Sequence, residues 1–451
     1  PRVRTAGAVP GTVRSGSVAR KCFACRWDRA LVYVGLMTAL ELSPGSLHGL
    51  KVLDLTQMLA GPFCTMLLAD QGADVVKVEP VSGDAIRTMG PDLPETLDSG
   101  FGGYFQSINR GKRSLVLDLK QPEGVEVLKV LAATADVLVE NFRAGVMERL
   151  GLSYETLRER NPKLVYGAIR GFGDPRSGES PYNDWPAFDV VAQAMGGMMG
   201  VTGPDAETPL KVGPGVGDMV PAMFATIGIL SAVRHAERTG EGQFVDVAMY
   251  DGMLALCERI VYQYSYGGVV PRPEGNAHPI FTPFGLFPAK DGWVSIACPL
   301  DHFWHTLAEA MDRPELAEDD RFADVAGRAR HRDEVNGIVT AWTQARSKGE
   351  IGERLGGKVP FGPVNQIDDI VDDPHVAVRS MMAEVHHPGL DAPVRIANTP
   401  IRMSATQGGV RGRAPILGEH SVEVLGDWGI DAEDVDRLRS RAVIRERTER
   451  T

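Results

Sequence analysis

The stretch KVLDLTQMLAGPFCTMLLADQGADVVKVE, residues 51–79, decides the fold of this chain. Lys51–Thr56 is a short apolar run typical of a buried strand, and Val75–Glu79 is a second one. Gly61–Asp70 between them predicts a helix, which Gly72 would end. A strand, a helix and a strand this close together predict two parallel strands joined by a right-handed crossover.

The same alternation continues along the chain. Ser114–Leu119 and Val137–Glu140 are predicted strands, and Pro122 begins a helix that we expect to end near residue 133, with proline in the tolerated first turn. Further on, Pro221–Arg238 predicts a helix ended by glycine, and Gln243–Met249 alternates like a strand with one buried face. The sequence therefore predicts an α/β domain with a Rossmann-like parallel sheet.

The loop after the first strand lacks the dinucleotide fingerprint. It has the sequence TQMLAGP, residues 56–62, instead of G-x-G-x-x-G. The main sequence evidence for NAD or FAD binding is therefore missing.

A change in amino-acid composition after Ile260 indicates a second domain. Gly267–Pro288 is rich in glycine and proline, and the residues after it mix short strands, such as Trp293–Ala297, with helices up to about Val364. The boundaries we expect are an N-terminal extension at 1–45, the first part of the large domain at 46–240, a linker at 241–275, the small domain at 276–365, a linker and return to the large domain at 366–440, and a charged tail at 441–451.

The composition is that of an ordinary globular protein. The 451 residues include 48 Lys and Arg and 59 Asp and Glu, which gives a net charge of -11, and 43% are hydrophobic. Such a chain can bury a substantial core, which excludes disorder as its main state. Its acidic total argues against a general nucleic-acid binder. Its longest apolar run, Ala30–Leu40, is too short to span a membrane, so no membrane partner is expected.

The cysteines and the two ends add little chemistry. Five cysteines in a long chain favour a reducing compartment, and we expect the cytoplasm. Cys22 and Cys25 form a C-x-x-C without a second pair, so no metal site is predicted. The first 36 residues carry seven Lys or Arg and one acid, which is typical of a non-native start or of a transit peptide. Arg437–Thr451 predicts a solvated charged tail.

Four segments combine unusual composition with positions on loops that follow predicted strands, where α/β proteins place ligands: Asp54–Pro62, Asn109–Lys120, Phe188–Gly203 and Lys211–Met223. Asn109–Lys120, NRGKRSLVLDLK, concentrates basic residues and, with Arg143 and Arg149, forms the basic cluster that the acidic total otherwise lacks. Charge alone favours a solvated basic face over phosphate recognition. Phe188–Gly203 is rich in glycine and methionine, and by itself predicts a well-packed buried helix.

A single carboxylate, Asp218, stands among glycines in Lys211–Met223, KVGPGVGDMVPAM. Glycine-dense backbone can approach a ligand closely and offer N–H groups to an oxyanion. Asp218 is either the N-cap of the following helix or a nucleophile, and its position alone favours the cap.

From Gly49 to about Gly426 the chain resembles the class III CoA transferases, which include formyl-CoA transferase, carnitine CoA transferase and the α-methylacyl-CoA racemases. The segments that carry the resemblance are GLKVLDLTQMLAGP, GADVVKVEP, NRGKRSLVLDLK, ADVLVENFRAG, NPKLVYGAIRGFG, FDVVAQAMGG, the GD at residues 217–218, RTGEGQFVDVAMYDG, GNAHPIFTPFGLF, VPFGPVNQIDDIVDDP and APILGEH. Many ordered segments at family-like spacing make the resemblance specific.

The resemblance implies a role for each matched residue. The family's catalytic aspartate falls on Asp218. Its coenzyme A contacts fall on Leu59, Ala60, Leu117, Asp118, Leu119, Lys120, Asn141, Phe142, Arg143, Arg149, Pro186, Ala187, Phe188 and Asp189. Pro80 replaces an Arg and Leu59 a Gln of the formyl-CoA transferases, and Ala277–Phe281 replaces their glycine-run loop. Substrate choice therefore cannot be transferred from them.

The reaction that the resemblance implies is CoA transfer from an acyl-CoA to a carboxylic acid, through an aspartyl mixed anhydride and an aspartyl-CoA thioester. Coenzyme A and acyl-CoA are then substrates, and no cofactor is bound permanently. An ionised aspartate with an ordinary pKa needs no partner base to attack a thioester. The family also implies a small domain inserted into the large one, and an interlinked homodimer.

Two alternatives stay open. An acyl-CoA racemase needs an acid and a base at the α-carbon, and Phe188 stands where the racemase branch carries one of them, a histidine. A CoA-binding protein without turnover is the second alternative, against which the intact Asp218 argues.

Overall fold

The structure, a computed structural model, describes residues 44–91, 102–388 and 390–446. The expected N-terminal extension, with Cys22 and Cys25, lies outside the described residues except for its last two positions. Within the described part the chain forms three sheets.

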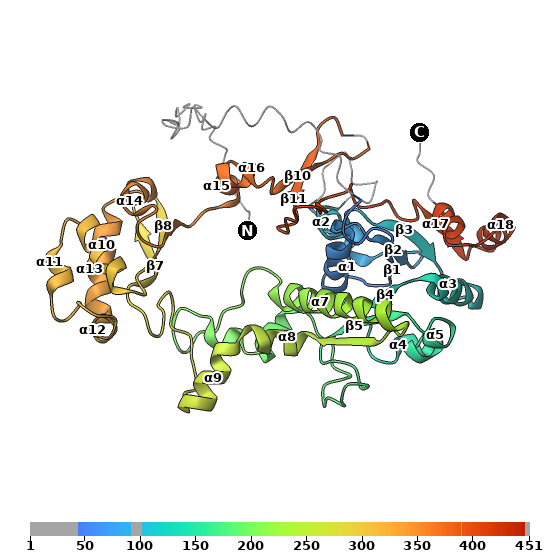
Figure 1. Ribbon diagram of the computed structural model, residues 1–451, viewed down its shortest axis with the longest axis horizontal. Helices are drawn as coiled ribbons and strands as arrows, with labels where there is room; N and C mark the ends of the chain where they lie inside the picture. The colour runs from blue at the N-terminus through green and yellow to red at the C-terminus, as the bar shows by residue number, and fades with distance from the viewer. Residues whose placement is uncertain (1–43, 92–101, 389, 447–451) are drawn as a thin grey trace, which may run out of the picture. The chain divides into compact units, whose positions relative to one another are not determined.

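The largest sheet has seven strands, two of which come from residues 51–79 (Figure 1). Its order is β12-β3-β2-β1-β4-β5-β6, and all neighbours are parallel except β12 and β3. The strands are β1 (Lys51–Asp54), β2 (Asp74–Glu79), β3 (Arg113–Leu117), β4 (Val137–Glu140), β5 (Val165–Arg170), β6 (Phe244–Ala248) and β12 (Ile444–Arg445). The order 3-2-1-4-5-6 of the parallel strands is that of a doubly wound Rossmann-like sheet, which confirms the predicted fold class.

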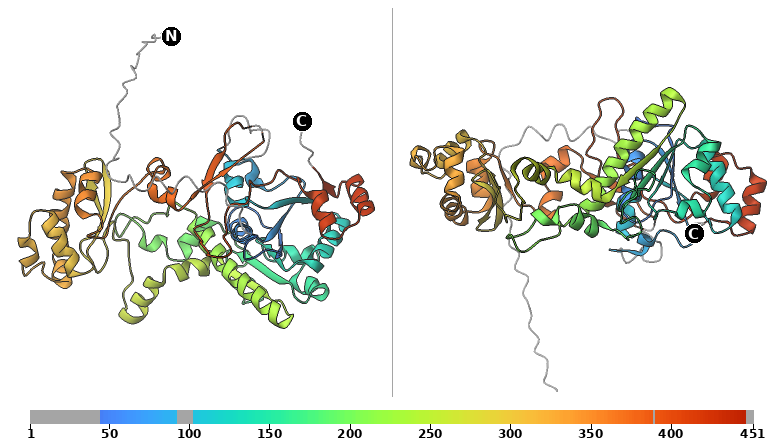
Figure 2. Two further views of the ribbon diagram at one scale, coloured as in Figure 1. Left: turned by 45° about the horizontal axis from the view of Figure 1, so that its top comes forward. Right: turned by 90° about the horizontal axis from the view of Figure 1, so that it is seen from below.

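Helices cover both faces of this sheet (Figure 2). Because successive side chains of a strand point to opposite faces, neighbouring residues contact different helices. Val52 belongs to the core cluster with helices α1 (Ala60–Asp70), α7 (Val216–Thr239) and α8 (Met249–Leu256). Its neighbour Leu53 belongs to the opposite cluster, with α3 (Pro122–Thr134), α5 (Tyr154–Arg160), α17 (Ser421–Asp427) and α18 (Ala432–Ser440). Burial on both sides explains why the strands are continuous apolar runs.

Local sequence signals set several boundaries of these elements. Gly72 follows α1 with φ of 100°, a conformation that glycine adopts without strain, and Pro122 stands in the first turn of α3 as expected. The helix predicted from residue 221 begins five residues earlier, at Val216, with Pro221 inside it. The predicted start of this helix was therefore wrong by more than one turn.

The C-terminal tail was also predicted wrongly in part. Val443 and Ile444 are buried, and Ile444–Arg445 pairs with β3 as an antiparallel edge strand. Residues up to 445 thus complete the large sheet and are no solvated tail.

Shorter elements connect the strands of the large sheet and follow it. They are η2 (Ala85–Thr88), α2 (Gly103–Asn109), α4 (Val146–Arg149), α6 (Asp189–Met195), η4 (Met199–Val201) and α9 (Glu258–Gly267), and, further along the chain, α15 (Ile367–Val371) and α16 (Pro374–Val378). A two-stranded antiparallel sheet pairs β10 (Met382–Val385) with β11 (Val394–Ala397).

Residues 284–363 have a hydrophobic core of their own, in which Trp304 and Phe322 are fully buried. The strands β7 (Phe284–Ala289), β8 (Gly292–Ala297) and β9 (Phe361–Pro363) form an antiparallel sheet. Its helices are α10 (Asp301–Ala310), α11 (Glu315–Glu318), α12 (Val325–Arg330), α13 (Arg332–Gln344) and α14 (Lys348–Leu355).

Helix α7 alone among the described helices is long and apolar enough to cross a membrane, with a mean hydropathy of 1.7 over its most apolar 18 residues. Core helices meet the same criterion, and Ala222, Ala225 and Ile229 of α7 belong to the core. Glycine, serine and proline interrupt the apolar residues of this helix, so it contains no long unbroken apolar run in the sequence.

Candidate active site

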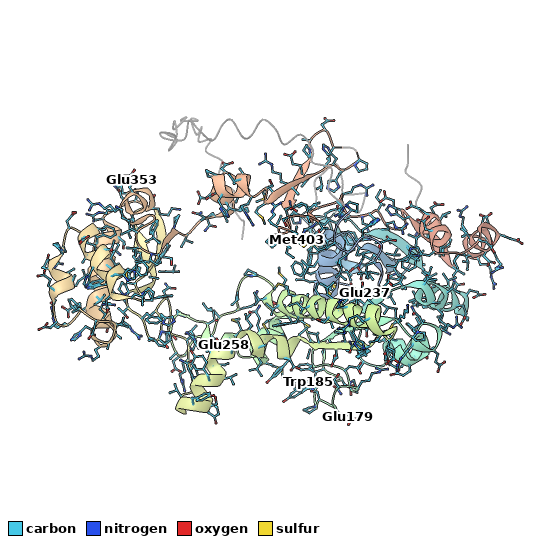
Figure 3. The ribbon with its side chains drawn as sticks, viewed as in Figure 1. Glu179, Trp185, Glu237, Glu258, Glu353 and Met403 are labelled. Atoms are coloured by element: carbon cyan, nitrogen blue, oxygen red, sulfur yellow. The ribbon has the colours of Figure 1, made fainter. Side chains whose placement is uncertain are left out.

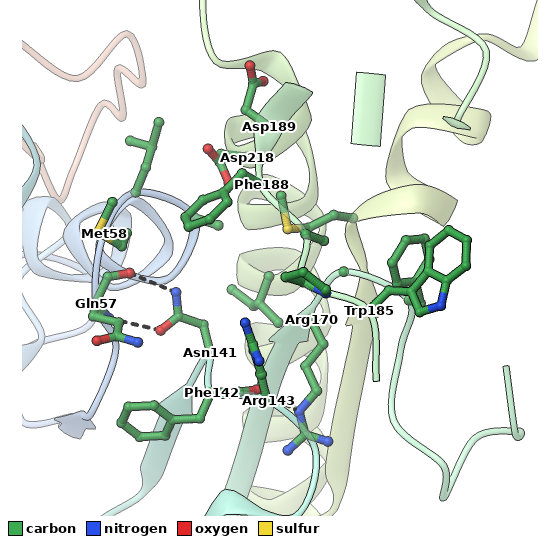
Figure 4. Close-up of a pocket in the computed structure, with 18 of the residues that line it drawn as sticks. Gln57, Met58, Asn141, Phe142, Arg143, Arg170, Trp185, Phe188, Asp189 and Asp218 are labelled. Carbon is green, nitrogen blue, oxygen red and sulfur yellow. Dashed lines mark hydrogen bonds between the residues drawn. The ribbon is translucent and has the colours of Figure 1, made fainter. Parts of the chain in front are cut away.

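A cavity of about 460 Å³ opens where the strand order of the large sheet reverses, at the carboxyl ends of β1 and β4. Ligands of doubly wound sheets bind at this point, because the loops on either side of it diverge. Residues from the loops after β1, β4 and β5 and from the starts of α6 and α7 line the cavity (Figure 4). Those expected from the sequence are Leu59, Ala60, Asn141, Phe142, Arg143, Pro186, Ala187, Phe188, Asp189 and Asp218.

The first loop of the cavity is fixed by a side chain from the second. Asn141 accepts the N–H of Gln57 through Oδ1 at 2.8 Å and donates through Nδ2 to the Gln57 carbonyl at 2.7 Å. Met58, which follows Gln57 in the chain, has φ of 66°, a backbone conformation that is costly for a residue with a side chain. Both polar atoms of Asn141 are therefore engaged in shaping the loop before Leu59.

Asp218 lies in the first turn of α7 and does not cap the helix. The N-cap residue is Gly215, whose lack of a side chain leaves the first N–H groups without a local acceptor. Asp189, which lies outside the helix, provides an acceptor for one of these N–H groups. Its Oδ1 accepts the N–H of Gly217 at 2.8 Å. The expectation that Asp218 is the N-cap is therefore wrong, and its carboxyl is left to line the cavity.

Gly217 allows α6 and α7 to approach each other. A Cβ at this position would lie 2.5 Å from the Asp189 carbonyl oxygen, which is closer than such atoms come. Its N–H is already donated to Asp189, so it is not available to an oxyanion in this conformation. The glycine serves close packing between the two helix starts.

Burial of the carboxyl, with a smaller contribution from the neighbouring Asp189 carboxylate, raises the pKa of Asp218 to about 7. The sequence-based assumption of an ordinary aspartate, ionised throughout the neutral range, is therefore wrong. The partly buried position that lets the carboxyl face a substrate also makes its charged form costly.

Asp189 is held in place by a second buried group. The Nε2 atom of Gln193 donates to both carboxylate oxygens at 2.9 Å, and Oε1 of Gln193 accepts the N–H of Val212. Gln193 thereby joins α6 to the segment that leads into α7. This α6 is only seven residues long with Ala192 and Gln193 buried, in contrast to the well-packed helix predicted over 188–203.

Cationic side chains in the cavity differ in their partners. Arg170, at the end of β5, is buried and paired with Glu140 and Asp174. Lys211 is 44% exposed and lies 3.9 Å from Asp189 Oδ2. Arg143 is exposed at the end of the β4 loop.

The remaining residues with an expected coenzyme A contact lie outside this cavity. Leu117, Asp118, Leu119 and Lys120 line a second cavity of about 300 Å³, which shares Gln57 and Phe142 with the first. Arg149 lines neither cavity.

The basic cluster predicted from the sequence does not form as a surface. Three of its members are tied to carboxylates of the large sheet and its helices: Lys112 to Asp54 at 2.8 Å with both side chains buried, Arg110 to Asp70 at 2.7 Å, and Arg113 to Asp74 at 2.6 Å. Burial alone would raise the pKa of Asp54, but Lys112 and Lys77 outweigh it and lower it to about 2. These residues stabilise the fold, and neither phosphate recognition nor a solvated face describes them. Exposed basic side chains remain at Lys120, Arg143 and Arg149.

Sequence reasoning missed Tyr104, Arg170 and Trp185 of the cavity. It assigned no role to Gln57, Met58 and Lys211, although they lie in the segments 54–62 and 211–223 that it singled out. Trp185, labelled in Figure 3, packs against Tyr182 and Phe172 and is 54% exposed. Clustered aromatic residues in a loop could have indicated it. The glycine-rich segment 211–223 is a local signal for Lys211, although it indicates no role for this particular side chain.

No group of three His, Cys, Asp or Glu residues in the described ranges could hold a metal ion.

A family model for CoA-transferase family III matches residues 47–421. The chain belongs to this family. Succinyl-CoA:mesaconate CoA-transferase of Haloarcula marismortui is 51% identical over 86% of this chain and 97% of that protein. Succinyl-CoA–D-citramalate CoA-transferase of Chloroflexus aurantiacus is 36% identical over 89% and 98% of the two chains, and formyl-CoA:oxalate CoA-transferase of Streptomyces avermitilis is 35% identical over 88% and 99%.

Solved structures agree with the family. A CAIB/BAIF family protein from Brucella suis has a TM-score of 0.75 at 35% identity, over 85% of this chain and 99% of that one. Rv3272 from Mycobacterium tuberculosis has a TM-score of 0.72 at 29% identity, over 84% and 99%. The chain is accordingly an enzyme of the class III CoA-transferase family, whose substrates are CoA thioesters.

Proposed function

We propose that this enzyme moves CoA from succinyl-CoA to a short dicarboxylic acid, with Asp218 as the covalent carrier. The observation that carries the proposal is the half-buried Asp218 carboxyl in the wall of the cavity at the strand-order reversal. The donor and the acceptor class are suggested by the relative at 51% identity, which is named for succinyl-CoA and mesaconate. The relative with formyl-CoA and oxalate in its name is only 35% identical.

The proposed reaction begins with the ionised Asp218 carboxylate. One oxygen attacks the thioester carbonyl, the C–S bond breaks, and CoA thiolate leaves a mixed anhydride on the enzyme. The thiolate then attacks the aspartyl carbonyl and expels succinate, which gives an aspartyl-CoA thioester. The acceptor carboxylate attacks this thioester and releases CoA thiolate, which attacks the acceptor carbonyl. Acceptor-CoA forms, the Asp218 carboxylate returns, and no net proton is consumed.

Coenzyme A is proposed to extend from the Asp218 cavity into the second cavity at Leu117–Lys120. The two cavities share Gln57 and Phe142, so an elongated ligand can pass between them. Exposed Lys120, Arg143 and Arg149 are suitable partners for its phosphates. Asn141, by contrast, is assigned to holding the loop at Gln57.

The enzyme is further proposed to be a cytoplasmic homodimer. Helices α7 and α9 expose large apolar side chains, including Phe224, Ile227, Tyr264 and Tyr266, the last at 93%. Large exposed apolar side chains on a helix surface are suited to an interface. A second copy is the partner that the class III resemblance implies.

The racemase alternative lacks a proton carrier at the position where that branch has histidine. Phe188 lines the cavity there, and its ring cannot exchange a proton. Incubation of 2-methylacyl-CoA with the enzyme in deuterated water is expected to leave the α-proton unexchanged. Exchange at a rate comparable with CoA transfer would favour racemisation instead.

The decisive experiment traps the carrier. The enzyme is incubated with succinyl-CoA and hydroxylamine, digested, and analysed by mass spectrometry for a hydroxamate at Asp218. We also expect succinyl-CoA and mesaconate to give mesaconyl-CoA, and Asp218→Asn to abolish both results while leaving binding of free CoA in place. Turnover that persists in Asp218→Asn, or a hydroxamate on another residue, would overturn the mechanism, and absence of turnover in the native enzyme would favour a binding protein.

A further inference from the structure

We propose that Lys211 binds the distal carboxylate of the dicarboxylic substrate and so selects dicarboxylic over monocarboxylic thioesters. This inference rests on the proposed function, because it assigns the substrate class of the Asp218 cavity. It concerns a residue to which sequence reasoning assigned no role.

The surroundings of Lys211 leave its ammonium group ready for an anion. Nζ donates to the carbonyl oxygens of Val212 at 2.8 Å and Gly213 at 3.1 Å. An ammonium group has three N–H donors, and the Asp189 oxygen at 3.9 Å forms a long ion pair with Nζ but is too distant for a hydrogen bond. One N–H of the ammonium group thus has no hydrogen-bond partner among the described residues, and the side chain, which lines the cavity, is 44% exposed.

Lys211 is also on the side of the cavity where chemistry is proposed. Its neighbour Asp189 accepts the N–H of Gly217, the residue directly before Asp218. Figure 4 shows Asp189 and Asp218 close to each other at one end of the drawn residues. A substrate with its thioester carbonyl at Asp218 thus brings its acyl chain near these two carboxylates.

The two other cations of the cavity do not fit this task. Arg170 is buried and already paired with Glu140 and Asp174. Arg143 follows Phe142, the residue shared with the second cavity, and is proposed to serve the CoA part of the substrate. Among the described lining residues, Lys211 is left as the cation for the acyl end.

Charge gives the selection its physical basis. The distal carboxylate of a succinyl group enters a cavity that already contains Asp189 and Asp218, so it is repelled unless a cation compensates. A butyryl group has a methyl group at that end and gains nothing from Lys211. Charge-assisted hydrogen bonds of this kind change affinity by roughly 10- to 100-fold.

The test compares succinyl-CoA with butyryl-CoA in an assay without acceptor. Release of CoA is followed with hydroxylamine present, so that only the donor thioester enters the cavity, and kcat/KM is determined for each thioester. In Lys211→Met we expect the ratio of succinyl to butyryl kcat/KM to fall roughly 10- to 100-fold, mainly through KM for succinyl-CoA. Lys211→Arg, which keeps the charge, is expected to restore most of the ratio.

Two further variants separate selection from other effects. Arg143→Met should lower kcat/KM for both thioesters by the same factor, because both carry CoA. Lys358→Met makes the same change at an exposed lysine of the α14 to β9 connection and should alter neither value.

Several results would overturn the inference. Equal losses of kcat/KM for the two thioesters in Lys211→Met would make Lys211 merely structural, and unchanged kcat/KM for both would leave it without a role. A native enzyme that releases CoA from butyryl-CoA as efficiently as from succinyl-CoA would refute selection while leaving the proposed CoA transfer intact. Release from neither thioester would refute the proposed function and the inference together.

Discussion

The surroundings of Asp218 disfavour the charged form of its carboxyl, although the proposed chemistry needs that form. Burial and the nearby Asp189 raise its pKa to about 7, whereas a nucleophilic carboxylate must be ionised. Only roughly one tenth of the enzyme then carries the ionised group at pH 6. We expect log kcat/KM to rise with unit slope below pH 7 and to level off above pH 8, measured from pH 5.5 to 9 with succinyl-CoA.

Because the charge of Asp189 contributes to the raised pKa of Asp218, a variant of Asp189 is a matched control for the pH profile. Asp189→Asn keeps an oxygen that can accept the Gly217 N–H but removes the charge. The apparent pKa of the profile should therefore shift downward in this variant. A flat native profile down to pH 5.5 contradicts the raised pKa of Asp218.

The same titration affects stability. A carboxyl with a folded-state pKa above its unfolded value binds its proton more tightly when folded, so it contributes stability at low pH that is lost as pH rises from about 4 to about 7. Asp218→Asn removes this loss, and its advantage in free energy of unfolding should grow across that range to on the order of 3 kcal/mol. Thermal unfolding at pH 4, 6 and 8 measures the trend. Exposed Asp320→Asn is the control, and an equally pH-dependent difference there would refute the explanation.

At the scale of elements, the sequence predicted what local signals determine. The strands near 51–56, 75–79 and 137–140 and the helix from Pro122 are set by apolar periodicity and terminal residues, and they were placed to within two residues. The start of α7 was not, because its acceptor comes from Asp189, 28 residues away. Partners distant in sequence also decided that Lys112 and Arg110 are buried in ion pairs. Likewise, the pKa of Asp218 depends on a burial that no local pattern encodes.

The contact between α6 and α7 at Gly217 yields a third prediction. A Cβ there would meet the Asp189 carbonyl at 2.5 Å, so Gly217→Ala forces the two helix starts apart and displaces Asp218. We expect kcat for CoA transfer to fall by roughly 100-fold, since misplacement by about 1 Å can have this effect. Gly213→Ala in the same segment is the control, because nothing lies within 4 Å of its Cβ position. Equal activity of the two variants would contradict the packing role of Gly217.

The loop at Gln57 depends in turn on Asn141. Its two hydrogen bonds hold Gln57 and thereby help to keep Met58 at positive φ. In Asn141→Ala we expect faster amide hydrogen exchange over residues 57–60 in the ligand-free enzyme and a KM for succinyl-CoA raised about tenfold. Asn141→Asp, which keeps only the acceptor, should be intermediate. A raised KM without faster exchange would indicate direct contact with coenzyme A instead.

At the scale of the whole molecule, the two faces of the sheet differ in what they leave exposed. On the α7 side, residues such as Phe224 and Ile227 are apolar and exposed although their helix also forms the core, whereas α3 on the other face exposes only Val130 among its large apolar side chains. A helix that is apolar on nearly all sides needs a partner on its outer face. This asymmetry favours the outer face of α7 as the site of the proposed second subunit.

Light scattering during size-exclusion chromatography tests this arrangement. The native chain is expected at twice the 48.7 kDa of one subunit. Ile227→Glu places a charge at the proposed interface, where its burial is unfavourable, and should shift the enzyme toward monomer and lower its unfolding temperature. Val130→Glu makes the same change on α3 and should leave the dimer intact. A dimer that survives Ile227→Glu but dissociates in Val130→Glu would place the interface on the opposite face of the sheet.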